Sequence, residues 1–319
     1  MDLLKQTKEL CRLYNIKPAR QRGQNFLITE EIYNKIVAVA DLTKKDTVLE
    51  VGPGLGFLTV ELARRAKQVV AVEVDKKLAA VLQTALLARQ IENVQVINND
   101  ILKLDSNSLI SYFIRDSEAV KNKKIKGFKT KPLSAKAVKN AKGSLGELGM
   151  TAISSCKIVA NLPYNITSHF LRKFLTAEMK PSLSVLMLQK EVGERICAQP
   201  PQMSLLAISV QFYAQPRIVE YVGRDNFWPE PEVDSVIVKI KTKNILPEIN
   251  EKKFFQLVKF GFSSRRKMLK NNLAAGYRVK PSKAEKWLKL ANLDLNIRAQ
   301  DLSLKDWLKL FGVLEENML

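Results

Sequence analysis

The residues best suited to chemistry form one tetrapeptide, Asn161-Leu162-Pro163-Tyr164. The amide oxygen of Asn161 and the backbone carbonyl of Leu162 can each accept one N–H of an amine conjugated to a ring. Pro163 fixes the turn, and Tyr164 offers a face on which a base stacks, a contact worth about 1–3 kcal/mol. The predicted chemistry is alkylation of an exocyclic amine. It needs no strong base, because the alkylated amine is acidic. The alternative is an ordinary turn with a buried tyrosine.

A second motif is the glycine-rich run Glu50-Val51-Gly52-Pro53-Gly54-Leu55-Gly56. Glycines allow a tight turn and a close approach of the backbone to a ligand. Phe57 stands where a nicotinamide fingerprint needs a small residue, so the spacing favours S-adenosylmethionine, which has no phosphate. Glu73 follows Gly52 by 21 residues and is placed to accept both ribose hydroxyls. The alternative is a glycine turn that holds no ligand.

Two further residues have a functional and a structural interpretation. Asp100 ends a strand-like run, where its carboxylate can accept from an adenine amino group or cap a helix. Phe227 begins a proline-rich loop that leads into the last apolar run. Its ring can supply a second stacking face for a base, or it can pack in the core.

Short apolar runs alternate with helical patterns and place these motifs at strand ends. We expect strands over 47–51, 69–74, 94–97, 157–161 and 185–188, a closing pair of strands over 205–222 and 235–240, and helices over 30–40, 57–66, 78–88 and from 251 onward. Such alternation predicts an α/β fold with a largely parallel sheet covered on both faces.

Composition points to a polyanionic partner. The chain has 319 residues, with 52 Lys and Arg against 32 Asp and Glu, a formal charge of +20. Excess charge of this size is typical of nucleic-acid binding. The single histidine, His169, and three scattered cysteines give no metal site, and no run of membrane-spanning length occurs. We therefore expect a cytoplasmic protein with no metal and no membrane contact, and a monomer by default.

The motifs together resemble one enzyme family. Besides the two motifs above, the chain carries Gly23-Gln24-Asn25-Phe26-Leu27, Met187–Glu191, Phe227–Ser235 and Phe262–Lys267 in that order. This combination resembles the small-subunit ribosomal RNA adenine dimethyltransferase family, over roughly 10–112 and 155–312. The resemblance implies a Rossmann-like class I S-adenosylmethionine-dependent methyltransferase sheet with a small C-terminal helical domain. It also implies dimethylation of N6 on two adjacent adenosines near the 3′ end of small-subunit rRNA.

The resemblance also assigns residues. It places Asn25, Leu27, Gly52, Gly54, Glu73, Asp100 and Asn161 at the cofactor and Asn161, Leu162, Pro163, Tyr164 and Phe227 at the reacting base. Asn25 and Leu27 rest on the resemblance alone. We expect Arg265, Arg266, Lys267 and Lys270, on one helix, to bind RNA phosphates. A solvated helix face is the alternative.

The expected domains are a basic segment over 1–24, a methyltransferase domain over 25–241 and an RNA-binding domain over 251–319. A basic insertion over about 115–155 separates Asp100 from Asn161, and it is interpreted as a solvated excursion or an RNA-clamping arm. Two other functions remain open. One is the sister activity on large-subunit rRNA that gives macrolide resistance, and the other is a non-catalytic ribosome assembly factor.

Overall fold

The computed structural model describes residues 2–18, 23–104, 109, 156–177, 180–243 and 249–318. The insertion expected over 115–155 therefore lies outside the described residues. The chain forms two compact units, one of Met1–Lys190 with Arg217–Thr242 and one of Glu191–Pro216 with Lys243–Leu319. The C-terminal helices thus share their unit with Glu191–Pro216, a segment that the sequence had led us to expect within the methyltransferase domain.

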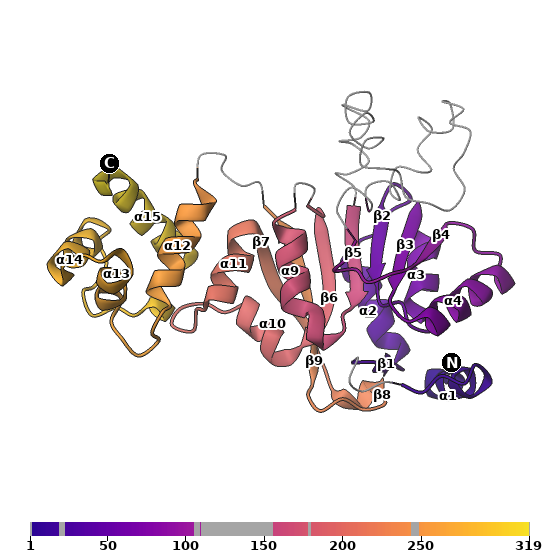
Figure 1. Cartoon of the computed structure of the whole chain (residues 1–319). Helices are drawn as coiled ribbons and strands as arrows, with labels where there is room; N and C mark the ends of the chain where they lie inside the picture. The colour runs from indigo at the N-terminus through magenta and orange to yellow at the C-terminus, as the bar shows by residue number, and fades with distance from the viewer. Residues whose placement is uncertain are drawn as a thin grey trace, which may run out of the picture. The chain divides into compact units, whose positions relative to one another are not determined.

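The first unit is built on a sheet whose described strands follow the order β4-β3-β2-β5-β6-β9-β7 (Figure 1). Their bounds are β2 Thr47–Val51, β3 Gln68–Glu73, β4 Val94–Asn98, β5 Cys156–Asn161, β6 Leu183–Gln189, β7 Ala214–Val222 and β9 Ser235–Thr242. Strands β4 to β6 run parallel, and β9 pairs antiparallel with β6. The predicted α/β, Rossmann-like sheet is confirmed.

Helices α2 (Glu30–Ala40), α3 (Phe57–Arg65) and α4 (Lys76–Ala88) cover one face of the sheet. Ile36 of α2 and Leu62 of α3 join Val48 and Val159 in one buried cluster. Side chains alternate between the faces of a strand, so Leu49 lies on the opposite face, and it is also fully buried. Burial on both faces explains why these strands are continuous apolar runs.

Two segments far apart in the sequence meet beside this sheet. The short strand β1 (Phe26–Leu27) pairs antiparallel with β8 (Phe227–Trp228), with Leu27 opposite Phe227. The helix α1 (Leu3–Leu13) precedes β1. The chain after β5 continues as a 3-10 turn, Tyr164–Ile166, and helix α9 (Thr167–Leu175).

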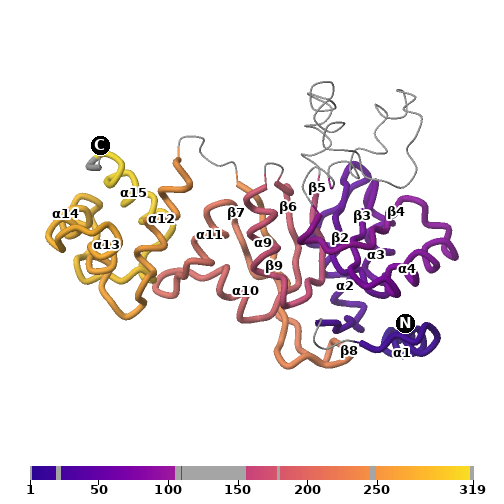
Figure 2. Tube along the Cα trace, in the orientation of Figure 1, coloured from indigo at the N-terminus to yellow at the C-terminus, as the bar shows by residue number. Residues whose placement is uncertain are grey.

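The second unit is helical, and Figure 2 shows its last four helices as one group. Its elements are α10 Lys190–Ile196, α11 Leu205–Tyr213, α12 Glu251–Gly261, α13 Leu269–Tyr277, α14 Pro281–Leu290, the 3-10 turn η4 Ala299–Asp301 and α15 Leu304–Met318. Trp287 and Trp307 are among its fully buried side chains. Among the described residues of both units, no helix is long and apolar enough to span a membrane.

The prediction of a strand beginning at Leu205 is wrong, because Leu205–Tyr213 is the helix α11. The Ser204 side chain accepts from the Ala207 N–H at 3.1 Å and so caps the start of that helix. The run is apolar on nearly every side, and a fully buried helix has no polar face that would distinguish it from a buried strand. The strand expected here is shorter and begins at Ala214.

Candidate active site

The glycine run joins β2 to α3 in a turn that requires glycine. Gly52, Gly54 and Gly56 have φ values of +66°, +57° and +86°, in the left-handed region. A Cβ on Gly54 would stand 3.3 Å from the Phe26 ring. The turn therefore opens as a cradle of backbone at the carboxyl end of β2, where open α/β sheets bind their ligands.

Glu73 lies at the end of β3 and faces this cradle. Its Oε2 accepts the Gly54 N–H at 3.1 Å, and its Oε1 accepts the Asp75 N–H at 2.9 Å. The side chain is buried, which raises the pKa of the carboxyl, while the backbone N–H groups of Asp75, Gly54 and Val74 oppose that rise. Each carboxylate oxygen has two lone pairs. This carboxylate therefore keeps accepting capacity for ribose hydroxyls.

Glu50 is a second buried carboxyl beside the cradle. It is 1% exposed, and its Oε2 has no hydrogen-bond partner among the described residues. Burial raises the pKa of Glu50 to about 8, the Thr59 hydroxyl lowers it, and the nearby charge of Glu73 adds to the rise. A buried oxygen without a partner is costly. This position is therefore suited to a ligand that brings a cation or a donor.

A cavity of about 450 Å³ connects these groups. Three carboxyl groups line it, those of Glu50, Glu73 and Asp100, and its lining includes no Lys or Arg among the described residues. A dinucleotide pyrophosphate would lack a counter-charge here. S-adenosylmethionine has a ribose, an α-ammonium and a sulfonium, which match these carboxyl groups as donors and as positive charges. When bound, it supplies the electrophilic methyl group.

Asp100 lies at the rim of this cavity, in the turn after β4. One of its oxygens accepts the Leu102 N–H at 2.9 Å, so the structural role foreseen for this side chain is present in part. No described residue bonds the other oxygen. The turn is held by Lys173 of α9, whose ammonium donates to the carbonyls of Ile101 and Leu102 at 2.9 Å each and to that of Leu104.

The tetrapeptide Asn161–Tyr164 lies directly against the cradle. A Cβ on Gly52 would stand 3.6 Å from Pro163 Cδ, and one on Gly23 would stand 3.4 Å from the Tyr164 nitrogen. Asn161 and Pro163 line the cavity. The Leu162 N–H donates to the Met187 carbonyl at 3.2 Å, which fixes the backbone of the loop on β6. The predicted proximity of this loop to the cofactor cavity is present.

Tyr164 is held from the far side by Ser235, the first residue of β9. The two hydroxyl oxygens are 2.7 Å apart. Partial burial raises the pKa of Tyr164, so the phenol stays neutral at physiological pH. The ring is therefore oriented by its hydroxyl rather than by packing alone.

The position of Phe227 does not suit the stacking role considered for it. The side chain is 3% exposed and belongs to the core cluster that includes Leu27. Strand pairing of β8 with β1 draws it inward. In this structure Phe227 packs in the core, which was the alternative, and it presents no open face to a base.

Asn25 and Leu27 both line the cavity, as the resemblance implied. Sequence reasoning missed Gly23 and Tyr33 as neighbours of the site. The Tyr33 hydroxyl donates to the Leu27 carbonyl at 2.8 Å and so holds β1 over the cavity. Gly23 has φ +62°, a backbone conformation that favours glycine. The glycine itself was the sequence signal of a tight turn at this position.

The four basic residues expected on one helix do not share one. Arg265, Arg266 and Lys267 are exposed in the turn between α12 and α13, whereas Lys270 lies in α13. The Lys270 ammonium is 2.7 Å from the Glu285 carboxylate, and its side chain is 19% exposed. Ser263 and Ser264 end the helical pattern before the arginines. Lys270 is thus in an ion pair with Glu285, which the sequence did not indicate.

The described residues contain no group of three or more His, Cys, Asp or Glu placed to hold a metal ion. Two solved structures are similar in fold. The 23S rRNA methyltransferase ErmE is 23% identical with a TM-score of 0.65, covering 91% of this chain and 100% of its own. A dimethyladenosine transferase from Plasmodium falciparum is 24% identical with a TM-score of 0.67, covering 92% and 98%.

Sequence comparison goes further than fold. The "Ribosomal RNA small subunit methyltransferase A" of Dehalococcoides mccartyi strain 195 is 39% identical over 318 residues, covering 99% of this chain and 95% of the relative. The protein of that name from Clostridioides difficile strain 630 is 34% identical, covering 98% and 96%. The family model "Ribosomal RNA adenine dimethylase" matches residues 16–316. The chain therefore belongs to the ribosomal RNA adenine dimethylase family of S-adenosylmethionine-dependent methyltransferases.

Proposed function

We propose that this protein transfers methyl groups from S-adenosylmethionine to N6 of two adjacent adenosines near the 3′ end of small-subunit rRNA, during ribosome biogenesis. The observation that carries the proposal is the contact between the glycine cradle and the tetrapeptide loop, with Gly52 against Pro163. It brings the acceptors suited to an exocyclic amine beside a cavity suited to the methyl donor. The identity of the RNA, that of the ribosomal small subunit, is inferred from the names of the relatives.

The reacting amine is held by two oxygen atoms. The Asn161 amide oxygen and the Leu162 carbonyl each accept one N6–H, so the nitrogen lone pair points into the cofactor cavity. Pro163 fixes the turn that makes the two acceptors converge. The Tyr164 ring, oriented by Ser235, stacks on the adenine. S-adenosylmethionine, held by the glycine cradle and Glu73, would supply the methyl group to this nitrogen. The resulting cationic amine then loses its proton to solvent.

Cofactor recognition falls to the cradle and the acidic side chains. Gly52 and Gly54 provide close backbone approach, and Glu73 takes the ribose hydroxyls. The Asp100 oxygen that no described residue bonds would accept from the amino group of the cofactor's adenine. Asn25 and Leu27 also line the cavity. Since two methyl groups are added to each amine, the cofactor must exchange between transfers.

RNA affinity comes from the basic surface. Arg265, Arg266 and Lys267 have no ion pair among the described residues, so they are available to phosphates. We propose a cytoplasmic monomer whose RNA binding weakens steeply with salt, since each neutralised phosphate releases counterions. Lys270 is in an ion pair with Glu285, so it has to exchange that partner to bind phosphate.

The experiment is methyl transfer from labelled S-adenosylmethionine to unmethylated small-subunit particles, followed by digestion and identification of the nucleosides. Dimethyladenosine at two adjacent positions near the 3′ end of the RNA is the expected product. Label in large-subunit RNA alone would instead assign the sister activity. Cofactor binding and particle binding without any product would assign an assembly factor.

A further inference from the structure

A second cavity, separate from the cofactor cavity, lies wholly within the second unit. Its volume is about 390 Å³, within the range of pockets that hold small molecules, about 300–1,000 Å³. Five of the side chains that line it carry the argument: Glu191 and Arg195 of α10, Gln202, Arg265 and Gln300. Of these five, only Arg265 has been given a role so far, as one of the residues proposed to bind RNA phosphates.

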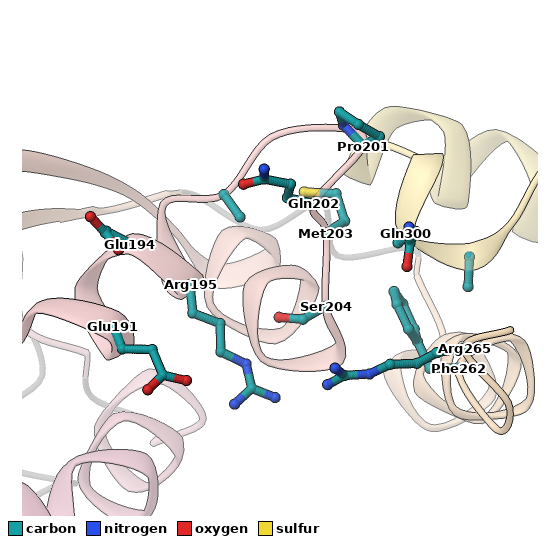
Figure 3. Close-up of a pocket in the computed structure, with 12 residues that line it drawn as sticks. Glu191, Glu194, Arg195, Pro201, Gln202, Met203, Ser204, Phe262, Arg265 and Gln300 are labelled. Carbon is teal, nitrogen blue, oxygen red and sulfur yellow. The ribbon is translucent and has the colours of Figure 1, made fainter.

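Two guanidinium groups converge on this cavity. Figure 3 shows the side chains of Arg195 and Arg265 extending toward one another from α10 and from the turn after α12. Neither forms an ion pair or hydrogen bond among the described residues. Two unpaired guanidinium groups that approach each other repel unless an anion lies between them. Guanidinium groups bind phosphate through paired N–H donors, so phosphate is the matching anion.

The rest of the lining is not that of a bare phosphate site. The Glu191 carboxylate is directed toward the guanidinium of Arg195, whereas the Glu194 carboxylate is directed away from it (Figure 3). The amide side chains of Gln202 and Gln300 border the cavity elsewhere. A ligand that suits all these groups has an anionic part and a part rich in N–H donors. A nucleotide has both, since its base can donate to a carboxylate or amide oxygen.

We infer that this cavity binds one unpaired nucleotide of the RNA substrate, distinct from the adenosine that reacts, with its phosphate between Arg195 and Arg265 and its base edge on Glu191. The base presents an N–H donor at the edge that meets Glu191. This inference rests on the proposed function, because that function makes RNA the substrate. It adds a second point of attachment, which sets the register of the RNA on the enzyme.

The first test measures binding of unmethylated small-subunit particles by Arg195→Gln, Arg265→Gln and the double variant. If both arginines hold one phosphate, each single change weakens binding about 5–10-fold, and the double change weakens it by much less than the product of the two. Arg195→Gln combined with Arg266→Gln is the control, since Arg266 is exposed on the same turn and does not line the cavity. Its effects are expected to multiply. If the losses of affinity caused by Arg195→Gln and Arg265→Gln multiply in the double variant, the two arginines do not share one phosphate.

The second test uses the sign of a charge effect. Glu191→Gln makes the protein one unit more positive, and simple attraction to RNA predicts tighter binding. If Glu191 accepts from a base, binding weakens instead, by about 3–10-fold. Glu316→Gln, an exposed carboxylate of α15 outside the cavity, is the charge-matched control and is expected to leave binding unchanged or slightly tighter. Tighter binding by Glu191→Gln would overturn the base contact.

Two controls separate this inference from the proposed function. The wild-type protein is first shown to methylate the same particles, and each variant is shown to retain cofactor affinity and melting temperature. If the wild-type protein methylates the particles and all variants bind them as tightly as wild type, the nucleotide pocket is disproved and the proposed function is unaffected. The measurements are repeated on protein-free small-subunit rRNA. If the variants weaken binding only to assembled particles, the cavity binds a ribosomal protein and the inference fails.

Discussion

The hydroxyl oxygens of Tyr164 and Ser235 lie 2.7 Å apart, which ties the loop after β5 to the first residue of β9. The ring that we propose for base stacking is therefore oriented by a strand that enters the sheet from the opposite direction. Strand β9, the last strand along the chain, thus orients a residue of the site without contributing a residue that touches the reacting atoms.

Ser235→Ala removes this bond and is expected to lower the rate of methyl transfer. A hydrogen bond between neutral groups contributes about 0.5–1.5 kcal/mol, so the loss is about 2–10-fold in kcat. The dissociation constant of S-adenosylmethionine is expected to stay the same. Tyr164→Phe deletes the same bond, and the double variant should be no slower than Tyr164→Phe alone. Independent, multiplying losses would mean that Ser235 acts in another way.

Glu73→Gln is expected to weaken cofactor binding about 10–100-fold. The carboxylate accepts from the Gly54 and Asp75 N–H groups on its two oxygens, and an amide nitrogen cannot accept from either. Bonds to a charged group are worth about 1.5–3 kcal/mol. Titration calorimetry with S-adenosylmethionine measures the change, with the exposed Glu92→Gln as control. Equal affinity in the two variants would remove Glu73 from the cofactor site.

Glu50→Gln is expected to stabilise the cofactor-free protein in a pH-dependent way. The folded pKa, about 8, lies above the ordinary value of 4.5, so folding favours the protonated acid. Wild-type stability therefore falls as pH rises from about 4.5 to about 8, because the unfolded chain releases this proton first. The neutral amide has no such loss. The melting-temperature difference between variant and wild type should grow across this window and then level off.

The comparison needs a variant with the same formal charge change at an exposed site, and Glu92→Gln serves again. Its melting temperature should follow the wild-type curve at every pH. A Glu50→Gln curve parallel to the wild type from pH 5 to pH 9 would show that Glu50 is ionised in the folded protein throughout that range.

Lys173→Met is expected to weaken cofactor binding from a distance. The lysine donates to three carbonyls in the turn that follows Asp100, and its loss leaves them without this donor. A several-fold rise in the dissociation constant of S-adenosylmethionine and a lower melting temperature should result. Arg172→Met, on the neighbouring exposed position of α9, is the control. A lower melting temperature with unchanged cofactor affinity would limit Lys173 to a structural role.

The sheet and the cofactor site could be predicted because local patterns determine them. A parallel strand buried on both faces is a plain apolar run, as at Thr47–Val51, and a positive-φ turn demands glycine, as at Gly52. The carboxyl ends of parallel strands lie at one edge, so Glu73 and Asp100 had to meet the glycine turn.

Other features depend on contacts that no local pattern encodes. Phe227 is buried because β8 pairs with β1, a strand about 200 positions earlier. Lys270 is paired because α13 packs against α14, which carries Glu285. The run Leu205–Tyr213 is apolar on both helical and strand periods, so only its neighbours decide between the two.

The most direct test of the central claim compares the wild-type protein with Asn161→Ala in three measurements: methyl transfer to unmethylated small-subunit particles, binding of those particles, and binding of S-adenosylmethionine. The amide oxygen is proposed to orient the reacting amine, while RNA affinity is assigned to the basic residues of the second unit. Methylation should therefore fall at least 100-fold, with particle binding within about twofold of wild type. Methylation that survives, or that falls only in step with particle binding, would contradict the role of the Asn161–Tyr164 loop.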